Sequence, residues 1–362
     1  MHLNRVTQAL ACKPFFYDSC SMICRTFRVL LVFLVGMLAA CNIDPIGLEL
    51  DSGWHARSMV AWKNTRPDML ALSPDGKWLY VSCETGASML APSLAAIDLE
   101  TGRPQILVSG LMRADGLKFA PDGSLWIGEE FPQGLIWRIA DVGHLPIGQK
   151  VDRARMVSSH RAIAPFRAAG RFAHEGITFS QDKRFAYLAD EAVKGSLYRL
   201  NLNTRRMDVL LTGKGWITIS PALDARDQAR HLQARTFNRI EDMETLPDGR
   251  ILMAETGTGS ILVLKDTGKH PEIEEYLHDS RIAHPDNLAW DAARKWLWIT
   301  DDSAPSSLWA WDGQKLRHIA THQHAEITGV LAVSGIIYFN LQGRSDGPEL
   351  TLRLSKVSAE NE

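Results

Sequence analysis

The chain has 362 residues, of which 45% are hydrophobic and 23% are charged, and its formal net charge is -2. This is the composition of a folded globular protein, and the length suits one large domain or two of ordinary size. A charge so close to neutral, without any basic cluster, argues against nucleic acid as a partner.

Residues 1–41 are predicted to be an export signal. Arg25 and Arg28 precede a short apolar run that ends in Leu-Ala-Ala-Cys at Cys41. A basic flank, an apolar core and small residues are typical of a secretory signal, and the run is too short to span a bilayer comfortably. Met22 is an alternative start. Leu-Ala-Ala-Cys resembles a bacterial lipobox, which predicts lipidation of Cys41; the alternative is a plain secretory signal.

A lipid on Cys41 would make the membrane a partner of an exported protein in the cell envelope. Asn42 after the cysteine favours the outer membrane, and the expected location is the outer membrane or periplasm if the organism is Gram-negative. Residues 42–62 show no clear period and are predicted to be a tether, with the folded domain at 63–355. Only Cys83 remains in that domain, so no intrachain disulfide is expected there.

One pattern recurs six times along the domain. A strand-like run that begins with an acid is followed by a turn and by a second strand-like run, which in most copies ends with one or two acids. Pro-Asp-Gly is the turn in three copies, where Pro presets φ and Gly takes positive φ, so Asp75, Asp122 and Asp248 are assigned to turns alone. The six copies begin at Asp68, Asp115, Glu175, Glu241, Asp286 and Glu326.

A third strand-like run usually follows, as at 135–139, 196–200, 260–264 and 307–311. A repeat of several short strands indicates a β-propeller. The fold class is therefore all-β, and we count six blades. The long spacers near 141–171 and 214–235 are predicted to be loop insertions between blades.

The acids are expected to form a ring. The innermost strand of each blade lines the central channel, and in an antiparallel hairpin its start lies beside the end of the second strand. His174, His284 and Asn287 stand in the same band. The ring would contain Asp68, Glu84, Asp115, Glu129, Glu130, Glu175, Asp190, Glu191, Glu241, Asp242, Glu255, Asp286, Asp301, Asp302 and Glu326.

Converging carboxylates repel one another unless they are protonated, paired or bound to cations. Oxygen ligands suit hard divalent ions, Ca²⁺ above all; the alternative is that these acids are solvated loop residues. His174, Glu175 and Arg171 are candidate catalytic residues, and Arg171 and Arg113 could meet a small anionic substrate. The predicted metal ligands are Glu129, Glu130, Glu175, Asp190, Glu191, Glu241, Asp242, Asp286, Asp301 and Asp302.

Several motifs, in this order, resemble those of the PhoX-type alkaline phosphatases. They are Arg-Phe-Ala-His-Glu at 171–175, Ala-Asp-Glu at 189–191, Asn-Arg-Ile-Glu-Asp at 238–242, Pro-Asp-Asn-Leu at 285–288, Trp-Ile-Thr-Asp-Asp at 298–302 and Glu-Ile-Thr-Gly at 326–329. The resemblance implies a six-bladed propeller that hydrolyses phosphate monoesters at a calcium and iron centre. It implies as ligands Glu129, Glu175, Asp190, Glu241, Asp286 and Asp301.

Two departures put the iron in doubt. The family has Cys-Glu-Glu where this chain has Gly128 before its two glutamates, so the thiolate that helps to hold Fe³⁺ is missing, and Cys83 stands one blade earlier. The family's His-Pro-Gly near the end is Gly-Arg-Ser at 343–345. Two other functions stay open: a Ca²⁺-dependent lactonase or esterase like the gluconolactonase and paraoxonase propellers, and a non-catalytic propeller that binds a partner at the cell surface.

Overall fold

The computed structural model describes residues 46–220 and 224–357. The predicted signal, the start at Met22 and the lipidation site Cys41 lie outside the described residues. From Leu48 onward the chain is one folded unit, and the next paragraphs concern this unit alone. None of the described helices is long and apolar enough to cross a membrane.

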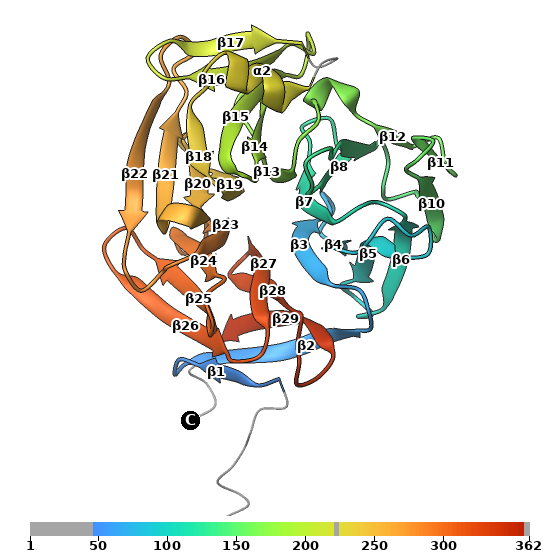
Figure 1. Cartoon of the computed structure of the whole chain (residues 1–362). Helices are drawn as coiled ribbons and strands as arrows, with labels where there is room; N and C mark the ends of the chain where they lie inside the picture. The colour runs from blue at the N-terminus through green and yellow to red at the C-terminus, as the bar shows by residue number, and fades with distance from the viewer. Residues whose placement is uncertain (1–45, 221–223, 358–362) are drawn as a thin grey trace, which may run out of the picture. The chain divides into compact units, whose positions relative to one another are not determined.

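Six sheets surround a common centre, so the unit is a six-bladed β-propeller (Figure 1). Blades are numbered 1 to 6 by their innermost strands, and each innermost strand contacts the next, with the sixth returning to the first. These strands are β3 (Pro67–Leu72), β7 (Ala114–Phe119), β13 (His174–Phe179), β19 (Ile240–Thr245), β23 (Pro285–Asp291) and β27 (Glu326–Val333).

Each blade continues outward through antiparallel neighbours. The second strands are β4 (Trp78–Cys83), β8 (Leu125–Glu129), β14 (Phe185–Asp190), β20 (Ile251–Glu255), β24 (Trp296–Asp301) and β28 (Ile336–Gln342). The third strands are β5 (Pro92–Asp98), β9 (Ile136–Ile139), β15 (Val193–Asn201), β21 (Ser260–Lys265), β25 (Ser306–Trp311) and β29 (Glu349–Lys356). The fourth are β6 (Pro104–Ser109), β12 (Ile163–Pro165), β16 (Met207–Leu211), β22 (Glu272–His278), β26 (Leu316–His322) and β2 (Trp54–Trp62).

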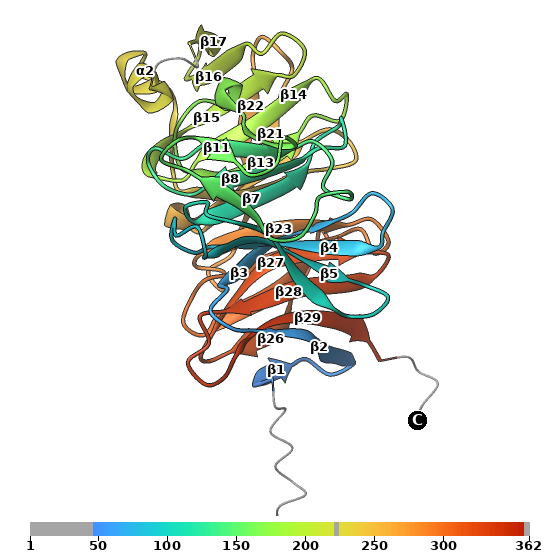
Figure 2. The ribbon, with the colours of Figure 1, turned by 90° about the vertical axis from the view of Figure 1, so that its right-hand side faces the viewer.

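Strand β2 closes the ring, because the first segment of the domain supplies the outermost strand of the last blade. It pairs with β29 from Trp54 opposite Lys356 to Trp62 opposite Glu349. Strand β1 (Leu48–Leu50) pairs with β26 at the edge of blade 5 (Figure 2). Most of the segment predicted to be a tether, 42–62, is therefore part of the propeller. Burial alternates along much of β2, as expected of a strand with one face on the core.

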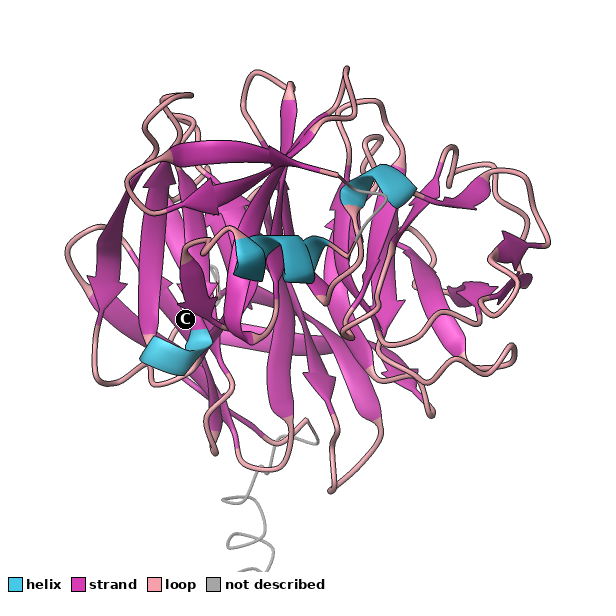
Figure 3. Ribbon diagram, turned by 45° about the horizontal axis from the view of Figure 1, so that its top comes forward, coloured by secondary structure: helices cyan, strands magenta, loops and turns pink. Residues whose placement is uncertain are grey.

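The two predicted insertions contain secondary structure of their own. The first adds β10 (Gln149–Asp152) and β11 (Val157–Ser158) to the edge of blade 1, contributes β12 to blade 2 and ends in a short 3-10 helix over Arg167–Ala169. The second adds β17 (Gly215–Ile219) and helix α2 (Ala225–His231), which is followed by β18 (Thr236–Asn238). A further 3-10 turn covers Thr256–Thr258. The few short helices of the unit are cyan in Figure 3.

Apolar side chains pack between neighbouring blades rather than around one centre. Each apolar cluster joins residues of two adjacent blades, such as Trp137 of blade 2 with Leu94 of blade 1. Trp126, Trp137 and Trp298 are among the largest fully buried side chains. Because the apolar surface is buried between the sheets, the central mouth is left to polar side chains.

Candidate functional site

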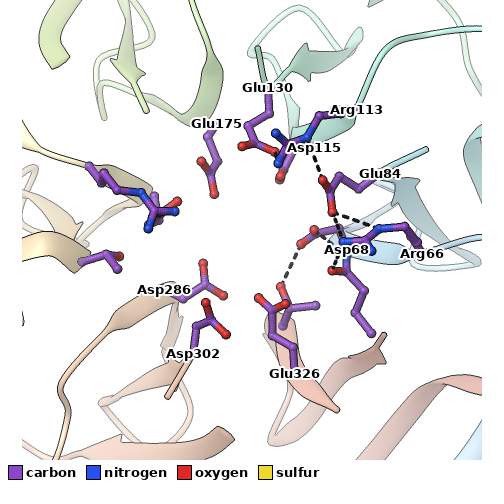
Figure 4. Close-up of a pocket in the computed structure, with 15 residues that line it drawn as sticks. Arg66, Asp68, Glu84, Arg113, Asp115, Glu130, Glu175, Asp286, Asp302 and Glu326 are labelled. Carbon is purple, nitrogen blue, oxygen red and sulfur yellow. Dashed lines mark hydrogen bonds and ion pairs between the residues drawn. The ribbon is translucent and has the colours of Figure 1, made fainter. Parts of the chain in front are cut away.

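A polar cavity of about 170 Å³ lies where the six innermost strands begin (Figure 4). We call it the acid pocket. Its lining includes nine carboxylates, from Asp68, Glu84, Asp115, Glu130, Glu175, Glu241, Asp286, Asp302 and Glu326. It also includes three guanidiniums, from Arg66, Arg113 and Arg239, together with Thr256, Thr328 and Gln342. The carboxylates exceed the guanidiniums by six charges if all are ionised.

Each innermost strand contains an irregularity in its pairing, which directs its acid toward the pocket. The pairing register shifts near the start of all six strands, for example between His174 and Ile177 in β13 and between Pro285 and Leu288 in β23. A bulge bends its strand and redirects a side chain. The acid of the first five strands is the first residue within the irregular stretch, and it points toward the common centre, as Glu175 and Asp286 do in Figure 4.

At the end of a second strand, two successive residues face different surroundings because side chains alternate along a strand. In blades 1, 2 and 5 the later residue of this pair is part of the pocket lining; these residues are Glu84, Glu130 and Asp302. The residue before it is not, as with Cys83, Glu129 and Asp301. Of the ten predicted metal ligands, the structure therefore brings Glu130, Glu175, Glu241, Asp286 and Asp302 into the pocket lining.

The other acids of these pairs have partners outside the pocket. Glu129 accepts hydrogen bonds from the backbone nitrogen of Met112 at 3.0 Å and from Arg153 at 2.9 Å. Asp301 accepts from the backbone nitrogen of His284 at 2.8 Å. Through these hydrogen bonds both carboxylates hold loops against the ends of their strands.

Asp190 and Asp242 also lie outside the lining. Arg226 of helix α2 forms an ion pair with Asp190, donating from Nε at 2.7 Å. Asp242 accepts from the backbone nitrogen of Leu288 at 3.0 Å and so joins blades 4 and 5. Sequence alone did not distinguish these structural carboxylates from those of the pocket, although the alternation of strand side chains gives part of the distinction.

Two groups of three carboxylates come close enough to share a cation. Oxygens of Glu130, Glu175 and Glu191 all lie within 4.8 Å of one another, and so do oxygens of Glu175, Glu241 and Asp286. Glu175 belongs to both groups. Its Oε2 is buried and has no hydrogen-bond partner among the described residues, and the same holds for Asp115 Oδ1. Buried carboxylate oxygens without partners are costly unless a cation or a proton satisfies them.

Burial makes these carboxyls hard to ionise in the absence of cations. It raises the pKa of Glu130 to about 8 and that of Glu326 to about 9, and neighbouring carboxylates add to both shifts. The pKa values of Asp115, Glu175 and Asp286 lie well above the ordinary range for the same reasons. Bound divalent cations would reverse this preference for protonation.

Asp68 has a different role within the lining. Its carboxylate accepts hydrogen bonds from Thr328 and Gln342, each at 2.8 Å, and its backbone carbonyl accepts one from Asn340. All three donors belong to blade 6. Asp68 therefore ties the first blade to the last at the point where the ring closes.

The three pocket arginines occupy one equivalent position. Arg66, Arg113 and Arg239 each stand two residues before a pocket acid of the innermost strand, with φ of 46°, 47° and 62°. A left-handed backbone conformation is uncommon for arginine. The conformation therefore follows from the place of these residues before the innermost strands and not from their residue type. Sequence reasoning noted Arg113 but missed Arg66 and Arg239; the spacing Arg-x-acid, repeated three times, is the signal that would have found them.

These arginines neutralise part of the acidic mouth. Glu84 lies between Arg66 at 2.6 Å and Arg113 at 2.8 Å, and Arg113 also pairs with Glu130. Arg239 pairs with Glu191 at 2.6 Å and with Glu241 at 2.7 Å. The side chains of the three arginines are about half exposed, so they can meet an anion that enters the pocket.

Two predicted catalytic residues are not in the lining. The His174 ring is buried against Phe172, with ring centroids 3.8 Å apart, and its Nε2 lies 3.4 Å from the carbonyl oxygen of Gly170. Burial lowers the pKa of His174 to about 3, so the ring is neutral at physiological pH. Arg171 is exposed and does not line the pocket. Of the three, only Glu175 reaches the candidate site.

The structure also explains the glycine at the position of the family cysteine. A Cβ at Gly128 would overlap the backbone carbonyl of His174, so no side chain fits there. Cys83 lies in the apolar cluster between blades 6 and 1, and burial raises its pKa. Neither position offers a thiolate to the pocket.

Neither a protein-family profile nor a curated protein matches this sequence, so the resemblance to the PhoX-type phosphatases gains no support from these comparisons. Solved propellers do match. A gluconolactonase from Xanthomonas campestris aligns with a TM-score of 0.57 at 12% identity, over 85% of this chain and 91% of that one. A luciferin-regenerating enzyme gives 0.56 at 8% identity, over 84% and 96%. Virginiamycin B lyase from Staphylococcus aureus gives 0.50 at 13%, over 84% and 100%. At these identities the likeness establishes the propeller fold alone.

Proposed function

We propose that this protein is a hydrolase that depends on divalent cations, with Ca²⁺ as the first candidate, and cleaves a carboxylic ester or lactone in the acid pocket. The observation that carries the proposal is the pair of three-carboxylate groups that share Glu175. The unpartnered oxygens of Glu175 and Asp115 fit the oxygen-ligand chemistry of Ca²⁺. The propeller fold shared with a gluconolactonase is consistent with this choice of substrate.

In this proposal the pocket residues have separate tasks. Glu130, Glu175, Glu191, Glu241 and Asp286 would hold the cations, which supply charge stabilisation for the oxygen that becomes negative in the transition state. The pocket arginines orient the substrate through an anionic or polar group. Asp302 and Glu326 line the pocket outside the two groups. Asp302 is the candidate to accept a proton from attacking water, because the pKa of Glu326, raised to about 9, keeps that carboxyl protonated at neutral pH.

A second candidate is a phosphate monoester, and one observation favours it. The two three-carboxylate groups share Glu175 and lie beside three guanidiniums. Cations held by these groups, together with the guanidiniums, would suit the charged oxygens of a phosphoryl group. Iron has no part in this version, because neither Gly128 nor Cys83 brings a thiolate to the pocket. The two candidates differ in the substrate and not in the site.

The test is elemental analysis of the purified propeller together with hydrolysis assays before and after chelation. The panel contains glucono-1,5-lactone, p-nitrophenyl acetate and p-nitrophenyl phosphate. Bound calcium and chelator-sensitive cleavage of the lactone or the acetate would support the proposal, whereas cleavage of the phosphate alone would select the second candidate. Calcium without any hydrolysis would leave a ligand-binding propeller, and absence of metal would overturn the proposed site.

We further propose that the protein is exported and anchored by a lipid on Cys41. The support is the sequence motif at the end of the apolar run. Palmitate labelling of the expressed protein tests this: labelling lost in Cys41→Ser supports the anchor, and a soluble, unlabelled wild-type protein contradicts it.

A further inference from the structure

A second cavity opens beside the acid pocket, between blades 1 and 6. It has a volume of about 820 Å³ and shares Arg66 and Glu84 with the pocket. We call it the side groove. Because the two cavities have these side chains in common, a molecule bound at the acid pocket can extend past Arg66 into the side groove.

The chemistry of the side groove differs from that of the pocket. More of its exposed surface is carbon than polar atoms, with Ala61 and Pro348 on its walls and the nearly buried Trp62 next to Ala61 in the chain. Lys63, Asn64 and Arg344 also line it. Two glycines, at 86 and 343, leave space open, because a Cβ at either would meet no atom within 4 Å. The acid pocket has a mainly polar lining, so the polarity changes sharply from one cavity to the next.

The walls of the side groove are fixed in place. The Glu349 carboxylate accepts hydrogen bonds from the backbone nitrogen of Arg66 at 2.8 Å and from that of Gly343 at 3.1 Å. It thereby joins the loop before β3 to the loop before β29. The Arg66 side chain is held by Glu84 at 2.6 Å and by Gln342 at 3.0 Å. The groove is therefore preformed and not a gap between unattached loops, as expected of a ligand site.

From this arrangement we propose that the side groove binds an apolar organic group of the substrate while the acid pocket holds the bond that is cleaved. This inference rests on the proposed hydrolase function and narrows its substrate class. The substrate is an ester with an alkyl or aryl substituent, with a polar or anionic group near Arg66. A small sugar lactone would fill the acid pocket and leave the side groove unused.

Gly86→Trp tests the groove without straining the fold. A Cβ at Gly86 meets no atom within 4 Å and the residue does not have positive φ, so the indole can enter the open space. Gly143→Trp is the matched control. Gly143 is exposed, its Cβ would meet only Asp141 at 3.9 Å, and it lines neither cavity.

Hydrolysis of p-nitrophenyl acetate, butyrate and octanoate gives the first readout. Wild-type kcat/KM is expected to rise with acyl length by roughly fourfold per methylene that is buried in the groove. Gly86→Trp should lose this rise, while Gly143→Trp behaves as wild type. Equal length dependence in all three proteins would overturn the inference and leave the proposed function standing.

Binding of 1-anilinonaphthalene-8-sulfonate, an anionic aromatic probe, gives a readout that needs no catalysis. We expect saturable binding to wild type and to Gly143→Trp, weakened about tenfold or more in Gly86→Trp. Identical binding to all three proteins would contradict the groove even if no ester is cleaved. Failure of the groove and failure of the hydrolase are thus distinguished.

Discussion

At the scale of single residues, Glu175 has a position that no other pocket carboxylate shares. It belongs to both three-carboxylate groups, and one of its oxygens is buried without a partner. Asp302 lines the same pocket but belongs to neither group. If cations bind as proposed, these two acids should respond differently to the loss of charge.

Glu175→Gln is therefore expected to weaken Ca²⁺ binding by about tenfold or more, since affinity follows the number of charged ligands. Asp302→Asn is the control and should change the affinity much less. Calorimetric titration of each chelated protein with Ca²⁺ measures the difference. Equal losses in both variants would mean that the pocket attracts cations by its total charge and has no defined ligands.

At the scale of elements, ring closure depends on two contacts between the ends of the domain. Strand β2 supplies the outer strand of blade 6, and Asp68 of blade 1 is held by Thr328 and Gln342 of blade 6. The Thr328 hydroxyl lies 2.8 Å both from Asp68 and from Asn287 of blade 5. Closure is thus secured at the rim by a strand and at the centre by side chains.

Thr328→Val keeps the shape of the side chain and removes its hydroxyl. We expect the free energy of unfolding to fall by about 1–3 kcal/mol, because a buried carboxylate and a buried amide lose a partner. Urea unfolding measures this change. Thr218→Val, which removes an exposed hydroxyl from Asp208, is the control and should cost less; a cost as large as that of Thr328→Val would remove the special role of the closure site.

Truncation separates the two N-terminal strands. A chain that begins at residue 52 lacks β1, which only extends the edge of blade 5, and we expect cooperative thermal unfolding to persist. A chain that begins at residue 63 also lacks β2 and exposes the edge of β29, so it should unfold without a sharp transition or aggregate. Circular dichroism and gel filtration report both outcomes. A well-folded shorter chain would show that β2 is dispensable for closure.

At the scale of the whole molecule, two kinds of carboxyl group have pKa values shifted in opposite directions. Carboxylates in turns have low pKa values because turn donors and neighbouring arginines hydrogen-bond to them, as with the half-buried Asp279 and Asp312 at about 2. Pocket carboxyls have high ones, as with Asp68 at about 6, Glu130 at about 8 and Glu326 at about 9. Unfolded acids titrate near pH 4, so the two kinds change stability in opposite directions.

The chelated protein should therefore be most stable in mildly acidic solution. Between about pH 4 and pH 9 the folded pocket keeps protons that the unfolded chain has lost, so stability falls as pH rises, by at most about 1.4 kcal/mol per pH unit for each carboxyl. Below pH 4 the turn carboxylates become protonated, and their smaller contribution to the free energy of unfolding is lost. Urea midpoints at pH 5, 7 and 9 measure this, and added Ca²⁺ should restore stability at pH 9. A midpoint that rises toward pH 9 in chelator would contradict the pKa pattern.

The fold could be predicted from the sequence because its signals are local and repeated. Strand-turn-strand runs with Pro-Asp-Gly turns recur at blade spacing, and the repeat itself fixed the class and the six blades. The acids at strand ends were placed at one mouth of the channel by antiparallel pairing alone. The segment 42–62 was misassigned because β2 finds its partner, β29, at the far end of the chain, and no local pattern indicates such a distant pair.

The acids that face the pocket were decided only by the tertiary structure. Glu129 and Glu130 are adjacent and alike in sequence, yet one binds Arg153 and a loop while the other faces the centre. Side chains alternate between the two faces of a strand, which distinguishes Glu129 from Glu130. Which of the two faces the pocket depends on where the pairing register shifts. The side groove also could not be foreseen, because Trp62, Gly86 and Pro348 come from segments that meet only after the ring closes. Local chemistry thus determined the repeat and its acids, and long-range closure determined which of them share a site.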